Sequence, residues 1–148
     1  LAASGPFGWL LNRVGALRWL EGWLTSYADT PVLFALALVG FILLVGTVIE
    51  AVPAIVVLGP TLVQACVKAG YHPVQAGMVI VVGFILGAVS PPVGIIYFTA
   101  AQIADETLEK VGVALIPFML VEVLAMFLLL WIPGFSLWLP AWFGFINL

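Results

Sequence analysis

The sequence has 148 residues, of which 65% are hydrophobic and only 7% charged, and its mean hydropathy is +1.30. This composition excludes an ordinary soluble domain and is typical of membrane proteins. With seven acidic and four basic residues, the net charge is −3 and no basic patch occurs, so we expect no nucleic-acid partner. Cys66 and His72 are the single residues of their types and offer no disulfide framework, metal-ligand set or nucleophile–base pair. We therefore expect a protein that is not an enzyme.

Residues 8–26 form the first predicted element, an amphipathic segment. At about 100° per residue, apolar residues such as Leu20 and Leu24 share one side of a helix, and Arg18 and Glu21 lie opposite. Its tryptophans suit the boundary between membrane and water. We expect an interfacial helix lying along the bilayer, or alternatively a helix packed on other protein.

Residues 31–68 are predicted to form a helical hairpin. Two apolar runs are joined by the segment Gly-Thr-Val-Ile-Glu-Ala-Val-Pro-Ala at residues 46–54. The second run, counted over residues 55–67, gives a helix of about 20 Å, which is too short for a hydrocarbon core of about 30 Å. This length favours a re-entrant hairpin that returns to its starting side. The alternative is a full span over residues 31–48 followed by an aqueous loop from Glu50 to Pro53.

Glu50 is the only acidic residue between Asp29 and Asp105. A carboxylate at membrane depth is costly and normally faces a partner, an ion or a water-filled cavity. At the hairpin tip, Glu50 would ligate a cation or accept backbone N–H bonds that hold the tip together. If the loop lies at the surface instead, Glu50 is an ordinary solvated residue.

Residues 73–104 are predicted to form a helix that is broken in the middle. Pro73 opens the helix, and the run Ser-Pro-Pro-Val-Gly at residues 90–94 interrupts it. Each proline removes an N–H donor and clashes with the carbonyl four residues earlier. Irregular backbone at membrane depth persists only when it is packed in protein or lines a cavity. Transporters use such discontinuous helices to hold ions and substrates, whereas a simple proline kink is the alternative.

The last predicted span covers residues 113–132. It is apolar except for Glu122, which we expect to face protein, and Pro133 ends it. The preceding cluster of charges at residues 105–110 is expected to be a solvated connector. Several aromatic residues after the span predict an interfacial belt, namely Trp138, Trp142, Phe143 and Phe145.

Four segments in this order resemble a known family. They are the hairpin tip at residues 46–54, Gly-Tyr-His-Pro-Val-Gln-Ala-Gly at 70–77, Gly-Ala-Val-Ser-Pro-Pro-Val-Gly at 87–94 and Ile-Pro-Gly-Phe-Ser-Leu-Trp-Leu-Pro at 132–140. Phe-Gly-Trp-Leu-Leu at residues 7–11 fits as well. The chain closely resembles the C-terminal third of the large membrane subunit of TRAP (tripartite ATP-independent periplasmic) transporters. The resemblance, and a start at Leu1, predict a piece of a longer polypeptide.

The resemblance implies an all-α integral membrane fold of the elevator type, built from two inverted repeats. This chain would supply the re-entrant hairpin (31–68) and discontinuous transmembrane helix (73–104) of the second repeat, with 8–26 as an arm. It also implies sodium as the coupling ion and no other cofactor or metal. The implied partners are the N-terminal repeat of the same subunit, a small membrane subunit, a soluble periplasmic binding protein and the lipid bilayer of the bacterial inner membrane.

Sodium sites in that family lie where a hairpin tip meets the unwound helix. Carried over residue by residue, the ion- and substrate-binding positions are Gly46, Thr47, Glu50, Pro53, Ala54, Ser90, Pro91, Pro92, Val93 and Gly94. Backbone carbonyls of an unwound helix are suitable oxygen ligands for such an ion.

Three residues depart from the family pattern. The family usually has aspartate at Glu50 and threonine at Ser90, and frequently asparagine at Gly83. The longer side chain changes the reach of the Glu50 carboxylate, whereas Ser90 keeps its hydroxyl. If the missing amide touches substrate in relatives, selectivity should differ here.

The sequence thus predicts a component of a sodium-coupled secondary transporter that imports a small organic acid, such as a dicarboxylate, delivered by a binding protein. The alternative from a different class is a structural or assembly subunit without its own transport site. It accounts for the glycines but not for two separate proline interruptions. A membrane-embedded hydrolase would need a base or metal set beside Glu50 or His72, and the sequence shows none.

Overall fold

The computed structural model describes residues 4–91 and 94–144, and every regular element among them is an α-helix. The prediction of an all-helical chain is therefore confirmed. In chain order the helices are α1 (Ser4–Val14), α2 (Ala16–Thr25), α3 (Pro31–Val48), α4 (Ala51–Lys68), α5 (Pro73–Val89), α6 (Ile95–Ala104), α7 (Leu108–Trp131) and α8 (Pro133–Trp142).

Proline sets the start of three helices. Pro31, Pro73 and Pro133 each stand in the first turn of their helix, where the missing N–H costs nothing. His72 precedes α5 as its N-cap, and its Nδ1 accepts a hydrogen bond from the Val74 N–H at 3.3 Å. The single histidine thus has a structural role in this chain.

The amphipathic segment differs from the single helix predicted over residues 8–26. It forms two helices, α1 and α2, because Gly15 takes a left-handed conformation with φ 84 that ends the first helix. Leu20 and Leu24, on the predicted apolar side, are buried. Since α2 packs on α4 and α3, this side faces protein, as in the alternative that the sequence left open.

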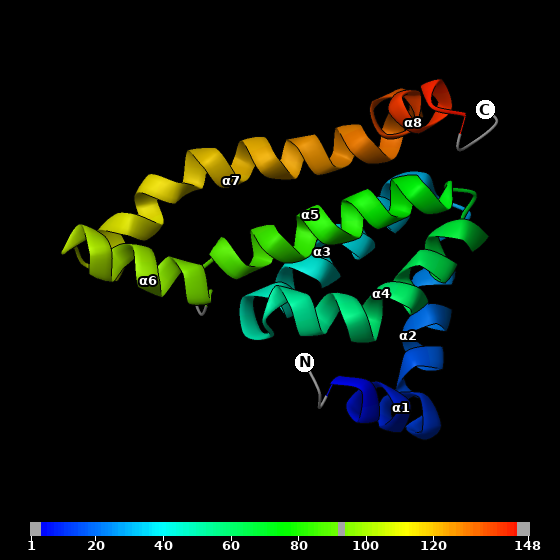
Figure 1. Cartoon of the computed structure of the whole chain (residues 1–148), viewed down its shortest axis with the longest axis horizontal. Coiled ribbons are helices and arrows are strands. Elements are labelled where there is room, and N and C mark those ends of the chain that lie inside the picture. The colour runs from blue at the N-terminus through cyan, green and yellow to red at the C-terminus, as the bar shows by residue number, and fades with distance from the viewer. Residues whose placement is uncertain (1–3, 92–93, 145–148) are drawn as a thin grey trace.

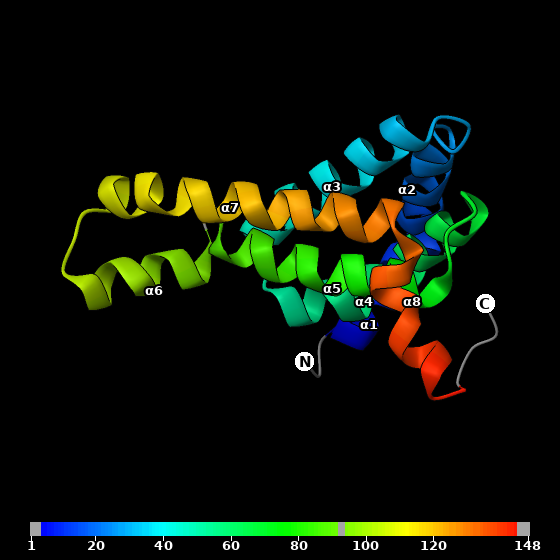
Figure 2. The ribbon, with the colours of Figure 1, turned by 90° about the horizontal axis from the view of Figure 1, so that it is seen from above.

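Helix α5 lies at the centre of the fold. Figures 1 and 2 show it between the hairpin helices α3 and α4 and the long helix α7, and it packs against all three. One hydrophobic core joins these four helices. Its fully buried side chains include Phe84 of α5, Phe34 and Leu38 of α3, Leu62 of α4 and Met126 of α7. This core fixes the hairpin on the first half of the broken helix.

Three helices of the described chain are long and apolar enough to cross a membrane: α3, α4 and α7. The second hairpin arm is longer than predicted, because α4 begins at Ala51 rather than after Pro53 and has 18 residues. Its length of about 27 Å removes the argument that this arm is too short to span. A different observation favours a re-entrant hairpin: its tip meets the end of α5, about halfway along the course of α7 (Figure 2).

Helix α7 starts at Leu108, five residues before the predicted span, and ends at Trp131. Its outer side is exposed, and Glu122 is exposed with it. None of the described helices covers Glu122, so the expectation that it faces protein stays a prediction. Trp138, Trp142 and Phe143 lie in and just after α8, and Phe145 lies outside the described residues.

Gln75 joins the start of α5 to the end of α7. The side chain is buried, and its Nε2 donates to the carbonyls of Leu129 and Leu130, both at 2.8 Å. The usual donor for the Leu129 carbonyl would be the N–H of residue 133, which is a proline and has none. Gln75 therefore satisfies a carbonyl that the break between α7 and α8 leaves open.

Candidate functional site: the hairpin tip and the broken helix

The hairpin tip consists of the last turn of α3, a two-residue connection and the first turn of α4. Gly46 and Ala54 are buried, whereas Thr47 and Pro53 are half-buried. The Thr47 hydroxyl donates to the Leu44 carbonyl at 2.8 Å. The tip is held by backbone geometry and short side chains.

Glu50 takes the N-cap position of α4, where its side chain accepts no capping hydrogen bond and is exposed. The expectation that this carboxylate holds the tip together through backbone N–H groups is therefore not met. The Glu50 carbonyl, by contrast, accepts the N–H of Ala54 at 3.1 Å and begins the helix. The carboxylate itself remains available to the surroundings of the tip.

The broken helix unwinds where the prolines predict. Helix α5 ends at Val89, and α6 begins after Gly94. Ser90 is buried; its N–H donates to the Gly87 carbonyl at 3.0 Å and its hydroxyl to the Leu86 carbonyl at 2.9 Å. Pro91 is half-buried, and Pro92 and Val93 lie outside the described residues.

Gly94 folds back onto the carbonyls that precede the break. Its N–H donates to the Ser90 carbonyl at 3.2 Å. A Cβ at this position would overlap the Ala88 oxygen and lie 2.7 Å from the Ser90 oxygen. Because residue 92 is a proline, the Ala88 carbonyl also lacks its usual helical donor. The break thus gathers two backbone oxygens around Gly94, of which the Ser90 oxygen accepts the Gly94 N–H and the Ala88 oxygen lacks its helical donor.

The tip and the break touch through two glycines. A Cβ added to Gly87 would lie 2.6 Å from Gly46 Cα and 3.2 Å from the Leu43 oxygen, and one added to Gly46 would lie 2.9 Å from Gly87 Cα. The two backbones are therefore in direct contact. The last turns of α3 and α5, which lead into the two segments expected to share a site, therefore lie against each other.

Four helix ends meet at this contact. Helices α3 and α5 both run from the hairpin base toward the centre of the fold, so their C-terminal ends lie together (Figures 1 and 2). The N-termini of α4 and α6 start on the other side of the two breaks, and neither has a side-chain cap. Helix C-termini carry partial negative charge and N-termini partial positive charge. The partial charges of the helix ends therefore differ in sign on the two sides of the breaks.

Sequence reasoning identified Gly87 only as a small residue on a packing helix, and not as the contact to the tip. The sequence does contain a feature that could have indicated this contact: each of the two helices that precede a break, α3 and α5, has a glycine near its C-terminal end. Which glycine meets which is set by the packing of α5 between α3 and α7, which the sequence pattern does not specify.

Gly83, where the family frequently has asparagine, faces the core rather than the contact of tip and break. A Cβ there would lie 2.6 Å from Met126 Cε and 2.7 Å from Ile42 Cγ2. Both neighbours are fully buried. In this chain their side chains take up the space beside position 83.

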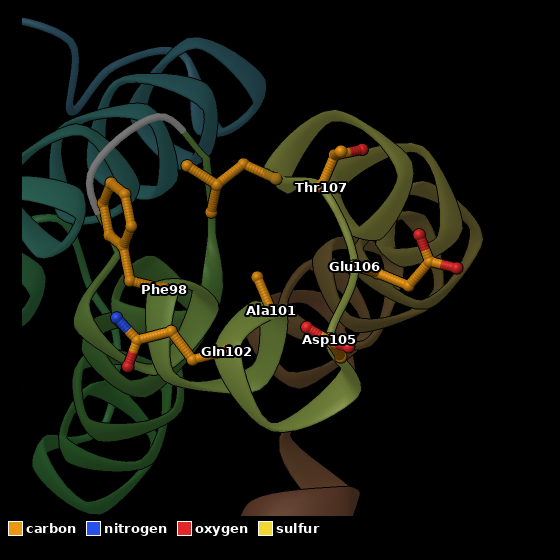
Figure 3. Close-up of a pocket in the computed structure, with 7 residues that line it drawn as sticks. Phe98, Ala101, Gln102, Asp105, Glu106 and Thr107 are labelled. Carbon is orange, nitrogen blue, oxygen red and sulfur yellow. The ribbon is translucent and has the colours of Figure 1, made fainter.

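A separate cavity of about 430 Å³ lies at the turn between α6 and α7, away from the tip. Figure 3 shows Phe98 and Gln102 on one side of it and Thr107 on the other. Glu106 pairs with Lys110 at 2.9 Å in an exposed position. Among the described residues, no three His, Cys, Asp or Glu side chains come together as metal ligands. This turn is a solvated connector in character.

An all-helical fold with three span-capable apolar helices and two helix breaks in contact defines the class of polytopic integral membrane proteins. Residues 1–135 match the family model described as "Tripartite ATP-independent periplasmic transporter, DctM component". The chain belongs to this family of TRAP transporter large permease subunits.

Curated relatives agree with this family. The chain is 26% identical over 125 residues to the C4-dicarboxylate TRAP transporter large permease protein DctM of Pseudomonas aeruginosa, covering 84% of this chain and 29% of that protein. It is 25% identical over 137 residues to the sialic acid TRAP transporter large permease protein SiaM of Vibrio cholerae, covering 93% and 32%.

A third relative is the isethionate TRAP transporter permease protein DctMQ of Oleidesulfovibrio alaskensis, 32% identical over 93 residues, covering 63% of this chain and 15% of that protein. The chain thus spans a third or less of the length of these relatives. These relatives are named as permeases and not as enzymes. No solved structure matches the chain.

Proposed function

We propose that this chain is the C-terminal part of a permease that couples sodium entry to the import of a small organic acid across the bacterial inner membrane. The observation that supports this most directly is the contact of Gly46 with Gly87, which places the hairpin tip against the break. In this proposal the protein is a secondary transporter and not an enzyme. The N-terminal repeat, a small membrane subunit and a periplasmic binding protein complete the machinery.

The oxygen ligands available at the contact suit sodium. The ion would bind at the C-terminal ends of α3 and α5, where the backbone carbonyls of the last turns and the hydroxyls of Thr47 and Ser90 offer oxygen ligands. Their helix ends supply negative potential without a buried ionised side chain. Exposed Glu50 adds long-range attraction in this proposal rather than a ligand oxygen.

The substrate carboxylate would bind at the N-termini of α4 and α6, whose first N–H groups have no side-chain cap. An ion bound between the tip and the break would hold these two N-termini in place for the acid. Transport then follows from movement of the hairpin and the broken helix as one body, as in an elevator mechanism. This arrangement makes acid binding depend on sodium.

Sodium-dependent stability of the full-length permease tests the ion site without knowledge of the substrate. Thermal unfolding is measured in sodium chloride and in potassium chloride at equal ionic strength. A saturating ligand stabilises the folded state, by about 2.7 kcal/mol at a hundred times its Kd, so the wild type should unfold at higher temperature in sodium. Ser90→Ala and the double variant Pro91→Ala/Pro92→Ala should lose this difference.

Ser136→Ala is the matched control, because Ser136 is buried in α8 and its hydroxyl has no hydrogen-bond partner among the described residues. It should keep the full sodium effect. Uptake of a labelled C4-dicarboxylate, sialic acid and isethionate into proteoliposomes, with and without a sodium gradient, then tests transport. If no sodium effect appears, or the Ser90 and proline variants respond and transport like the wild type, the break is only a kink. The structural-subunit alternative would then stand.

A further inference from the structure

A groove and a pocket lie side by side between the helices α1 and α2 and the hairpin helix α4. The groove, about 640 Å³, has polar side chains from both walls, namely Asn12, Arg18, Glu21, Thr61 and Gln64. The pocket, about 160 Å³, is lined only by apolar residues: Phe7, Leu11, Ile49, Pro53, Ala54 and Leu58. Val57 lines both, so the two spaces adjoin.

The charge of the groove is net positive. Glu21 is neutralised by Lys68, whose Nζ lies 2.8 Å from its carboxylate oxygen. Arg18 is exposed and has no ion pair among the described residues. Arg18 therefore gives the groove an unbalanced positive charge, surrounded by hydroxyl and amide donors. A phosphate group fits this chemistry.

The polar and apolar residues of the two spaces are ordered along α4. Along α4 the polar groove residues Thr61 and Gln64 lie toward the hairpin base, and the pocket residues Pro53 and Ala54 lie at the tip. From Gln64 to Pro53 the helix covers about 16 Å, close to the depth of one leaflet of about 15 Å. Figure 1 shows α2 crossing beside the base end of α4, with α1 turning back under α4 toward the tip.

We propose that the groove and the pocket together bind one phospholipid with an anionic headgroup. The phosphate lies at Arg18, and one acyl chain runs past Val57 into the apolar pocket. Because Ile49, Pro53 and Ala54 belong to the hairpin tip, the chain end packs against the segment that meets the broken helix. The bound lipid thereby braces the tip from the side opposite to the Gly46–Gly87 contact.

The test is photocrosslinking in the full-length permease reconstituted into phosphatidylcholine vesicles that contain a small fraction of phosphatidylglycerol with a diazirine near the end of one acyl chain. Crosslinks are mapped by peptide mass spectrometry. We expect them in α1 and in the peptide that covers residues 49–58. Unlabelled phosphatidylglycerol should compete them away, whereas excess inorganic phosphate should not.

Arg18→Gln should reduce crosslinking at residues 49–58 about fivefold, as expected for one basic side chain near a membrane surface. Arg13→Gln is the charge-matched control: it removes the same charge from the neighbouring helix. Arg13 does not line the groove itself, although it lies over the ring of the groove residue Trp9, 5.1 Å from its centroid. Leu11→Phe fills the pocket and should abolish the crosslinks to residues 49–58.

Four results would overturn the proposal. Equal crosslinking in wild type and Arg18→Gln would mean that the groove does not select the headgroup. An equal loss of crosslinking in Arg13→Gln would mean that the lipid responds to the general surface charge and not to Arg18 in the groove. Loss of the crosslinks in excess inorganic phosphate would mean that the groove binds free phosphate rather than the lipid. If no crosslink forms because another segment of the permease fills the groove, the lipid is excluded as well. None of these readouts involves sodium or transport, so they leave the proposed function untouched.

Discussion

Gly87→Ala is the substitution that most directly tests the contact between tip and break. The added Cβ would lie 2.6 Å from Gly46 Cα and 2.9 Å from Gly46 C. Carbon atoms in van der Waals contact are separated by about 3.5–4.0 Å, so α3 and α5 must move apart by about 1 Å. Both contacts are backbone atoms and cannot turn aside as a side chain can.

The energetic cost follows from two opposing effects. Forcing a methyl group into packed space costs about 1–3 kcal/mol, and replacing glycine by alanine inside a helix returns about 1 kcal/mol. The difference is a net destabilisation of up to about 2 kcal/mol. We expect a larger loss of transport, because the four helix ends that would hold ion and substrate are displaced. Sodium-dependent uptake should fall more than tenfold, and the sodium-dependent shift in unfolding temperature should shrink.

Gly77→Ala provides the control on the same helix, since an added Cβ there meets nothing within 4 Å. It should leave the sodium effect and uptake unchanged and raise the unfolding temperature slightly. Membrane insertion of both variants is checked by protease protection. If Gly87→Ala binds sodium and transports like Gly77→Ala, the tip does not rest on α5 and the site has been placed wrongly.

Two further substitutions test the surroundings of the site. Gly83→Asn should destabilise the permease by about 1–3 kcal/mol in thermal unfolding, because its Cβ would lie 2.6 Å from Met126 Cε and 2.7 Å from Ile42 Cγ2. Shortening both neighbours in the same chain, by Met126→Ala and Ile42→Val, should make the added Gly83→Asn change less destabilising than it is in the wild type. An equal loss in both backgrounds would contradict the packing. Gln75→Leu should lower the free energy of unfolding by about 1–3 kcal/mol, because the Leu129 and Leu130 carbonyls lose their hydrogen-bond donor. Gln102 is exposed, so the control Gln102→Leu should change this free energy by less than about 0.5 kcal/mol. Equal unfolding temperatures for the two glutamine variants would refute the role of Gln75.

Local residue chemistry was enough to predict most helix limits. Pro31 and Pro73 open α3 and α5, and the prolines after Ser90 end α5, since these effects act within one turn of the chain. The arm was predicted less well. A glycine inside an amphipathic pattern is compatible with a continuous helix, and only the structure shows that Gly15 adopts the left-handed conformation.

The start of α4 shows a second limit of sequence reasoning. The sequence pattern places Pro53 in a loop. Proline is tolerated in the first turn of a helix, however, and the two residues before it, Ala51 and Val52, are already helical. The helix therefore begins at Ala51, and the predicted short arm becomes long enough to span. The position of the tip at the middle of α7, which tertiary packing sets, carries the argument for a re-entrant hairpin instead.

The glycines at the site follow from what the two breaks require of the backbone. For helix dipoles and free carbonyls to act on one small ion, two C-terminal ends must approach more closely than side chains allow. Gly46 and Gly87 permit this approach between helices, and Gly94 permits it within the break, where its Cα lies against the Ala88 and Ser90 carbonyls. A larger residue at any of the three would separate the oxygens from one another. Glycine inside a helix is less stable than alanine by about 1 kcal/mol, so the buried side chains beside the contact, Ile42, Phe84 and Met126, are needed to hold α3 and α5 together.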